Sequence, residues 1–118
     1  SPLRNTEDID AVIKLALENN YNSVISITEP IYSSHLFCSI KKNNTIESLI
    51  KNKANFNRQE LQNEFVINGA CYFATREFLF ENKKFVNSST YGYIMPQERS
   101  VDIDTLFDWR IAQLLHKP

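Results

Sequence analysis

Apolar residues recur along this chain with two different spacings, and the first spacing predicts a helix. From residue 6 to about residue 19 the apolar positions lie three and four residues apart, which places them on one helical face. Asn5 or Thr6 can cap this helix. Glu7 and Asp8 fall in its first turn, where the helix dipole favours acidic side chains. The apolar positions are Ile9, Val12, Ile13, Ala16 and Leu17.

Short runs rich in β-branched residues follow this helix and predict strands. The clearest run covers residues 23–28 and is apolar enough to be a buried strand. In a second run, Asn68 and Gly69 interrupt the pattern where a bulge or a close backbone approach would use a glycine. Further predicted elements are strands at 64–74 and 91–95 and helices at 76–81 and 105–115. Helices that alternate with strands indicate a layered α/β fold.

The region between residues 29 and 65 has a different character. Residues 36–40 can be extended, residues 41–44 predict a turn, and residues 45–53 are polar and fit no single element. We interpret residues 29–65 as an excursion from the main sheet.

Composition narrows the class of protein. A chain of 118 residues with 42% apolar and 23% charged residues can bury a core as one domain or as part of one. Its net charge of −1 gives no basic surplus for binding a phosphate backbone, so we expect no nucleic acid partner. The sequence has no apolar run of the roughly 20 residues that span a membrane, so we expect no membrane insertion. Two glycines exclude a Gly-rich phosphate loop within these residues.

The cysteines and the first residues of the chain bear on its location and extent. Cys38 and Cys71 form no Cys-x-x-Cys pair, and nothing resembles a signal peptide, so we expect a cytoplasmic protein with free thiols. Ser1 to Arg4 contain no initiator Met and lead almost directly into a helix. We therefore expect the chain to begin part way through a domain.

Asp102 and Asp104 are the strongest candidates for chemistry. In extended backbone, carboxylates two residues apart project to the same side, and Ile103 points to the other. Mg²⁺ is commonly held by one or two carboxylates together with water and substrate phosphates, so such a pair suits nucleotidyl transfer. On spacing alone, the more common alternative is that Asp104 or Thr105 caps the following helix.

Arg58 and Asn68 could each have a functional or a purely structural role. Arg58 can hold a carboxylate or phosphate through two parallel hydrogen bonds, although a solvated surface arginine is more common. Asn68 lies within an apolar strand, where an unpaired amide would cost about 1–3 kcal/mol. A bound sugar hydroxyl or a neighbouring loop would satisfy it.

Four blocks of the sequence, in order, resemble motifs of the acylneuraminate cytidylyltransferases, which make CMP-sialic acid and related sugars. Residues 1–4 resemble the end of the family's QPTSPLR motif, and residues 57–61 resemble its RRQ-D/E-LP segment. Residues 68–73 are similar to its NGAIYI strand, and residues 100–109 to its SVDID..LDW motif. The strand at 23–26 also resembles the family's SVVSV strand.

The resemblance implies a Rossmann-like, three-layer α/β/α nucleotidyltransferase domain, of which these residues form the carboxy-terminal half. It implies attack of a sugar-acid hydroxyl on the α-phosphorus of CTP, with Asp102 and Asp104 holding the Mg²⁺. Residues 29–65 then correspond to a dimerisation segment, so an intertwined homodimer is implied. The implied substrate-binding residues are Arg58, Gln59, Asn68 and Phe85, the last acting from the partner subunit.

Some alternatives stay open. The family's CTP-binding loop lies in its amino-terminal half, so we expect these 118 residues alone to be inactive. Legionaminic acid or another 3-deoxy-2-keto sugar acid is an alternative substrate. A non-catalytic dimerising module, or a truncated relative of the enzymes, is the alternative from another functional class.

Overall fold

The computed structural model describes residues 1–49 and 64–116, which fall into two compact units. The first unit joins residues 1–28 to residues 66–118, and the second covers residues 29–65. The second unit has the same bounds as the predicted dimerisation segment, whose role stays a prediction.

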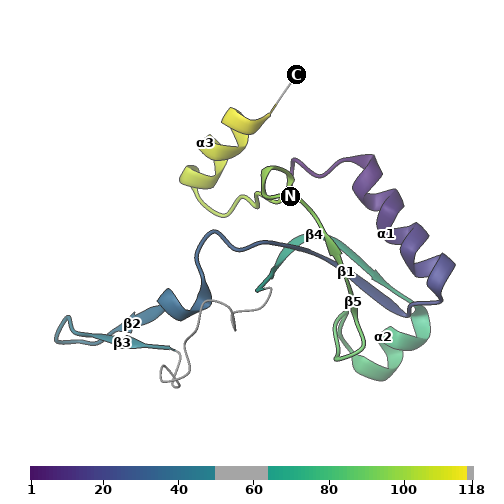
Figure 1. Ribbon diagram of the computed structural model, residues 1–118, viewed down its shortest axis with the longest axis horizontal. Helices are drawn as coiled ribbons and strands as arrows, with labels where there is room; N and C mark the ends of the chain where they lie inside the picture. Colours follow the sequence, from purple (N-terminus) through teal and green to yellow (C-terminus); the bar gives the residue numbers. More distant parts are fainter. Residues whose placement is uncertain (50–63, 117–118) are drawn as a thin grey trace. The chain divides into compact units, whose positions relative to one another are not determined.

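The first unit is built around a mixed sheet (Figure 1). Within the described residues its strand order is β4-β1-β5, with β1 antiparallel to β4 and parallel to β5. All but one of the side chains of β1 are buried, as predicted for a central strand. The strands are β1 (Ser23–Thr28), β4 (Val66–Ala74) and β5 (Tyr91–Ile94); the helices are α1 (Thr6–Asn19), α2 (Arg76–Asn82) and α3 (Leu106–Leu115), with the 3₁₀ turn η3 (Gln97–Arg99). The predicted α/β class is therefore confirmed as a mixed helix and sheet fold.

Helix α1 packs on β1 and β4, but its buried stripe is narrower than predicted. Val12 and Ala16 are buried in the core, whereas Ile13 is 41% exposed and Leu17 is 67% exposed. The third buried side chain of α1 is Asp8, four residues before Val12. The core cluster consists of Val12, Ala16, Val24, Ala70, Cys71 and Met95, with Tyr21, Phe73 and Tyr93 packed against it.

The glycine in β4 marks the predicted bulge. The pairing of β1 with β4 shifts register between Ile25, which lies opposite Tyr72, and Ile27, which lies opposite Ile67. Gly69 lies inside the shifted segment with a φ of +73°, a backbone conformation that favours glycine. The bulge therefore depends on the residue type at this position.

We expect Gly69→Ala to destabilise the protein by about 1 kcal/mol, because a side chain disfavours positive φ. The strain would come from the backbone alone, since the nearest atoms to an added Cβ, one each from Tyr72 and Asp102, would lie 3.9 Å away. Urea unfolding would measure the loss. Gly69→Asn is the matched control, since Asn tolerates this conformation better and should cost less. An alanine variant as stable as the asparagine variant would contradict this account.

The second unit contains a short hairpin. Within its described residues, β2 (Cys38–Ile40) pairs antiparallel with β3 (Ile46–Ser48). The backbone N–H of Lys41 donates to the carbonyl of Thr45 at 2.8 Å, which closes the predicted turn. The 3₁₀ turn η1 (Ser34–Leu36) precedes the hairpin, and the backbone N–H of Ser34 donates to the Glu64 carboxylate at 3.0 Å. This bond joins the two ends of the second unit.

Large apolar side chains of the second unit are exposed to solvent. They come from the residues before the hairpin and from the hairpin itself: Ile31, Tyr32, Leu36, Phe37, Ile40, Ile46 and Leu49. Ile31, at 81% exposed, is the extreme case. We call this set the hairpin apolar set.

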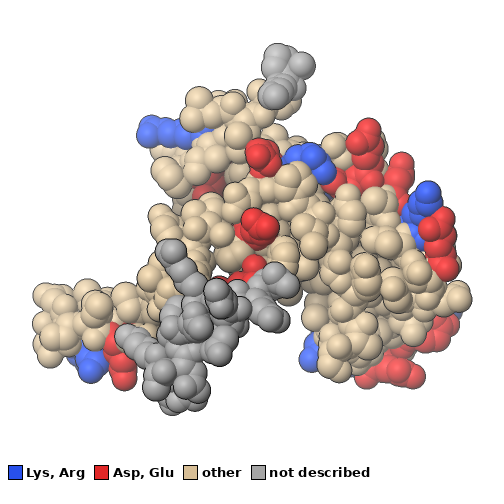
Figure 2. All heavy atoms as spheres, in the orientation of Figure 1, with Lys and Arg blue, Asp and Glu red and all other residues tan. Residues whose placement is uncertain are grey.

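The helices of the described residues are too short and too polar to cross a membrane. On the face drawn in Figure 2, acidic side chains gather over α1, whose exposed acids include Glu7, Asp10 and Glu18.

Candidate functional site

The segment between η3 and α3 carries the two predicted metal ligands. Asp102 and Asp104 are exposed, and Ile103 between them is half-buried, which is the predicted alternation. The side chain of Asp102 is 54% exposed, and its Oδ1 lies 3.0 Å from the amino nitrogen of Ser1. Figure 1 shows the N-terminus close to the chain that leads into α3. Both carboxylates can therefore be reached from solvent.

The cap of α3 is formed by other residues. Thr105 is the N-cap: its side chain accepts from the backbone N–H of Asp108, and Asp108 accepts in return from the backbone of Thr105. The Asp108 carboxylate accepts from the Asp104 backbone N–H, the Thr105 hydroxyl and the Thr105 backbone N–H, and these bonds, the first being the largest cause, lower the pKa of Asp108. Asp104 contributes to the cap through its backbone alone, so its carboxylate stays outside the capping box.

Asn68 is buried at the bulge and joins three parts of the first unit. Its Oδ1 accepts from the Ser26 hydroxyl at 2.5 Å and from the Ala70 backbone at 3.1 Å. Its Nδ2 donates to the Ser100 hydroxyl at 2.9 Å and contacts the Met95 sulfur at 3.4 Å. Protein groups thus satisfy the amide, and its predicted contact with substrate stays a prediction. The bond to Ser100 also ties the bulge to the start of the segment that carries the two aspartates. We call residues 101–104 the Asp102 segment.

Segments that are far apart in the sequence meet beside Asp102. Arg4 Nη1 donates to the Ala70 carbonyl at 2.5 Å, so the first residues of the chain contact the bulge. Gly69 faces Asp102, because an added Cβ there would lie 3.9 Å from Asp102 Oδ2. Asn68 reaches Ser100, as described above. Three of the four blocks recognised in the sequence, together with β1, therefore converge at one place in the fold.

Residues 57–61, the remaining block, contain Arg58 and Gln59 and lie outside the described residues. Phe85 lies in the first unit. It is 42% exposed, packs edge-to-face on Tyr72, and its carbonyl accepts from the Ser23 hydroxyl at the start of β1. The hydroxyl of Tyr72, on whose ring Phe85 packs, lies 3.9 Å from the Cβ position of Gly69, as does Asp102 Oδ2. The predicted action of Phe85 from a partner subunit stays a prediction.

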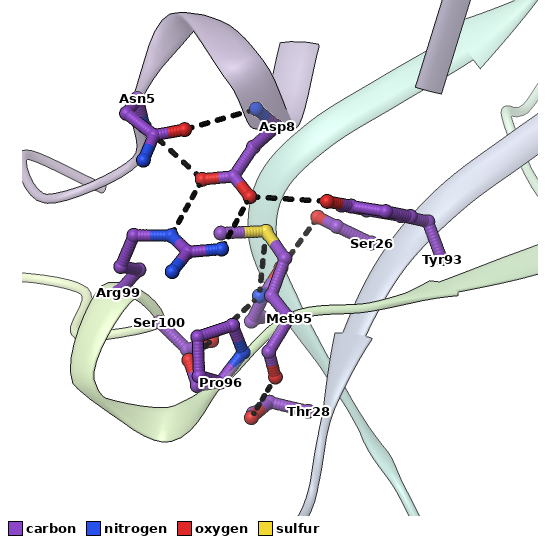
Figure 3. Close-up of polar contacts among 10 residues, drawn as sticks. Asn5, Asp8, Ser26, Thr28, Tyr93, Met95, Pro96, Arg99 and Ser100 are labelled. Carbon is purple, nitrogen blue, oxygen red and sulfur yellow. Dashed lines mark hydrogen bonds and ion pairs between the residues drawn. The ribbon is translucent and has the colours of Figure 1, made fainter. Parts of the chain in front are cut away.

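The buried carboxylate of Asp8 also lies near the site, and its role was not predicted from the sequence (Figure 3). Its Oδ2 accepts from Arg99 Nε at 2.9 Å and from the Asn5 backbone at 3.1 Å. Its Oδ1 accepts from Arg99 Nη2 at 2.8 Å and from the Tyr93 hydroxyl at 3.2 Å. Each oxygen of the Asp8 carboxylate thus accepts two hydrogen bonds. We call Asp8, Arg99 and Tyr93 the carboxylate hub.

Charge and burial act in opposite directions on the pKa of Asp8 and in the same direction on the pKa of Tyr93. Hydrogen bonds from Arg99 are the main cause that lowers the pKa of Asp8, and burial partly offsets them. Burial, followed by the charge of Asp8, raises the pKa of Tyr93. Asp8 is therefore ionised and Tyr93 neutral at pH 7.

We expect the hub to make stability depend on acidic pH. Because folding lowers the pKa of Asp8 from its ordinary value of 3.8, the stabilisation is fully present above that value and is lost as pH falls through the lower folded-state pKa. Thermal unfolding of the wild type and of Asp8→Asn from pH 6 to pH 2.5 would measure it. The gap between the two curves should narrow below about pH 4. Curves that stay parallel to the lowest pH would contradict the assignment.

A groove lies beside the Asp102 segment. It has a volume of about 520 Å³, and Ile103 lines it together with Trp109 and Ala112 of α3. The other lining residues are Pro2, Leu3, Gln113 and His116. The half-buried side of the Asp102 segment thus faces a mainly apolar surface, while its carboxylates face solvent.

The donor set limits the kind of metal that fits. Among the described residues, no group of three or more His, Cys, Asp or Glu side chains is placed to hold a metal ion. A closed structural zinc site of four ligands is therefore not formed by them. Two exposed carboxylates do fit Mg²⁺, which takes its remaining ligands from water and substrate phosphates.

Comparisons with known proteins confirm the resemblance seen in the sequence. The chain is 28% identical over 109 residues to an N-acylneuraminate cytidylyltransferase of Streptococcus agalactiae serotype V, and 29% identical over 114 residues to one of Escherichia coli O18:K1:H7. These matches cover 92% and 95% of the chain. It is also 26% identical over 119 residues to the post-translational flagellin modification protein B of Campylobacter coli, a match that covers 99% of the chain. No family model matches the chain.

The chain spans only part of each relative. The matches cover 26% of the Streptococcus protein, 27% of the Escherichia protein and 49% of the Campylobacter protein. The segments that converge beside Asp102 are thus one part of what the longer relatives contain.

Proposed function

We propose that this chain supplies the metal-binding carboxylates of a nucleotidyltransferase that transfers a cytidylyl group from CTP to a sialic-acid-type sugar. The convergence of residues 1–4, 68–70 and 100–104 beside two exposed carboxylates carries the proposal. Relatives at 28% and 29% identity that are named N-acylneuraminate cytidylyltransferases support the choice of reaction.

In this proposal Asp102 and Asp104 hold Mg²⁺. Both carboxylates are exposed and Asp104 lies outside the capping box, whereas Mg²⁺ would have to replace the amino group of Ser1 at Asp102 Oδ1. When bound, Mg²⁺ would neutralise charge on the triphosphate of CTP. The carboxylates would orient the ion and the substrate that shares it.

The reaction forms one bond and breaks one bond. The anomeric hydroxyl of the sugar acid attacks the α-phosphorus of CTP, so that a new P–O bond forms, the P–O bond to pyrophosphate breaks, and the hydroxyl proton is released to solvent. Arg58 and Gln59 are proposed to bind the substrates, as the resemblance implies. For Asn68 we propose a binding role through the backbone bulge that its amide holds in place.

The larger architecture is also part of the proposal. The mixed sheet and its helices are compatible with a Rossmann-like, three-layer α/β/α domain. We propose that the hairpin apolar set is covered by a second copy of the chain, because apolar side chains exposed over one short segment favour association. Phe85 would then act in the site of the partner subunit.

The dimer has its own test. We expect Ile40→Lys combined with Ile46→Lys to shift the protein from dimer to monomer, because these side chains lie opposite each other on the hairpin and are both exposed. Sedimentation velocity would measure the change. Leu17→Lys, an equally apolar and exposed position on α1, is the control and should stay dimeric. A hairpin variant that stays dimeric would remove this segment from the interface.

The activity is tested by pyrophosphate release from the full-length protein. Release that requires CTP, Mg²⁺ and N-acetylneuraminic acid together would support the proposal. Legionaminic acid and an eight-carbon 3-deoxy-2-keto acid complete the panel and would identify the sugar. No release with any of them would favour the alternative of a non-catalytic dimerising module. Turnover by residues 1–118 alone would show that they are sufficient, against our expectation.

A further inference from the structure

The Asp102 segment has a fixed point at each end. At its carboxyl end, the Thr105 and Asp108 capping box begins α3. At its amino end, the Ser100 hydroxyl donates to the Pro96 carbonyl at 2.7 Å and accepts from Asn68 at 2.9 Å. Only residues 101–104 span the interval between these points. The placement of the carboxylates therefore depends on where Ser100 is held.

The turn that precedes Ser100 is tied to the body of the first unit by Arg99. Inside η3, the backbone N–H of Arg99 donates to Pro96 and that of Ser100 to Gln97, at 3.2 and 3.0 Å. The guanidinium of Arg99 then makes its two bonds to Asp8 on α1 (Figure 3). A bidentate pair of this kind fixes orientation as well as distance.

Asp8 is itself held in place. It lies in the first turn of α1, where its side chain and that of Asn5 form the reciprocal capping box. Helix α1 is in turn packed on β1 and β4, and Arg4, just before it, reaches the Ala70 carbonyl. Asp8 thus connects α1 to η3, in addition to the bond from Asn68 to Ser100 and the chain that enters η3 from β5.

We propose that Asp8, acting through Arg99, is a positioning residue for the Asp102 and Asp104 carboxylates. This inference rests on the proposed function for its consequence in catalysis. Asp8 touches neither substrate nor metal in this account; it fixes the turn from which the carboxylate segment starts. Outer partners that orient the ligands of a metal commonly change its affinity by about 10- to 100-fold when they are removed.

The test uses Arg99→Lys in the full-length protein. Lysine keeps the positive charge near Asp8 but loses the two-bonded geometry. We expect the Mg²⁺ concentration for half-maximal turnover to rise about tenfold, with the KM of the sugar unchanged. Tyr93→Phe is the matched control, since it removes one hydroxyl bond to the same carboxylate and leaves Arg99 in place. It should leave the Mg²⁺ requirement within about twofold of the wild type, because this change does not loosen η3.

A second measurement needs no turnover. Hydrogen exchange of the Arg99 and Ser100 amides, both bonded within η3, should become faster in Arg99→Lys and stay unchanged in Tyr93→Phe. Unchanged exchange in Arg99→Lys would overturn the proposed tie whether or not the protein is an enzyme. Faster exchange with an unchanged Mg²⁺ requirement, corrected for the folded fraction, would overturn the positioning role. If the wild-type protein showed no nucleotidyl transfer, the proposed function would be wrong. Hydrogen exchange would then still decide whether Arg99 ties η3 to Asp8.

Discussion

Replacing Asp104 with Asn is expected to lower Mg²⁺-dependent nucleotidyl transfer by about 10²- to 10³-fold, the usual cost of removing one group that stabilises transition-state charge. Asparagine keeps the shape of the side chain and removes its charge. Because Asp104 serves the α3 cap through its backbone alone, the fold should be preserved. Steady-state pyrophosphate release at saturating CTP and sugar would measure the loss, and circular dichroism would verify folding.

Asp108→Ala is the control for this experiment. It removes a carboxylate from the same stretch of chain, but one that belongs to the capping box. We expect it to lower the unfolding temperature, because the cap is weakened, and to retain most activity below that temperature. If Asp104→Asn turned over at a near-normal rate, the metal assignment would be wrong. If both variants lost activity equally, the effect would belong to α3 and not to the metal site.

Asp8→Asn is expected to lower the free energy of unfolding by about 3 kcal/mol, at the lower end of the range for breaking a buried ion pair. Asparagine cannot accept both guanidinium bonds as a carboxylate does, and it leaves the charge of Arg99 uncompensated. The effect is moderated because the Arg99 side chain is 37% exposed and can recover hydration. Urea unfolding at pH 7 would measure the loss.

Tyr93→Phe provides the comparison for stability as well. It removes one neutral donor from the same carboxylate, and we expect it to cost about 1 kcal/mol. The difference between the two variants isolates the charged bonds of Arg99. Equal losses in the two variants would show that Arg99 adds little to the stability of the hub.

The order of helices and strands in the first unit could be predicted from the sequence, because the signals for them are local. The three- and four-residue spacing of α1, the β-branched run of β1 and the glycine in β4 each act over a few residues. Of the two predicted caps of α1, Asn5 forms the cap, and of the two predicted uses of Gly69 the structure shows the bulge. Local physics was sufficient for these features.

The carboxylate hub could not be found in this way. Asp8 fits a favourable first-turn acid, and its real partners lie on β5 and η3, far along the chain. One signal was present: Asp8 stands four residues before Val12 and in line with Ala16, so it occupies the buried stripe of α1. A charged residue on an apolar stripe predicts a buried partner, but only the fold identifies Arg99 as that partner.

In the candidate site, too, some features could be predicted from local signals and others could not. The alternation of Asp102, Ile103 and Asp104 could be predicted from strand geometry, whereas the prediction that the two aspartates bind a metal rests on the resemblance. Spacing alone favoured a cap, and the structure assigns that cap to Thr105. The bulge at Gly69, the turn η3 and the capping box of α3 are brought together by tertiary contacts, which cannot be predicted from the spacing of residues along the chain.

The place of β1 at the centre of the sheet has a consequence for how the protein folds. Its antiparallel partner β4 arrives only after residues 29–65 have looped out, and its parallel partner β5 comes later still. Folding slows as contacts become less local, so we expect these two pairings, and not the formation of α1, to limit the rate of refolding. Until they form, an apolar strand with both edges unpaired is exposed. Transient self-association should therefore begin at β1.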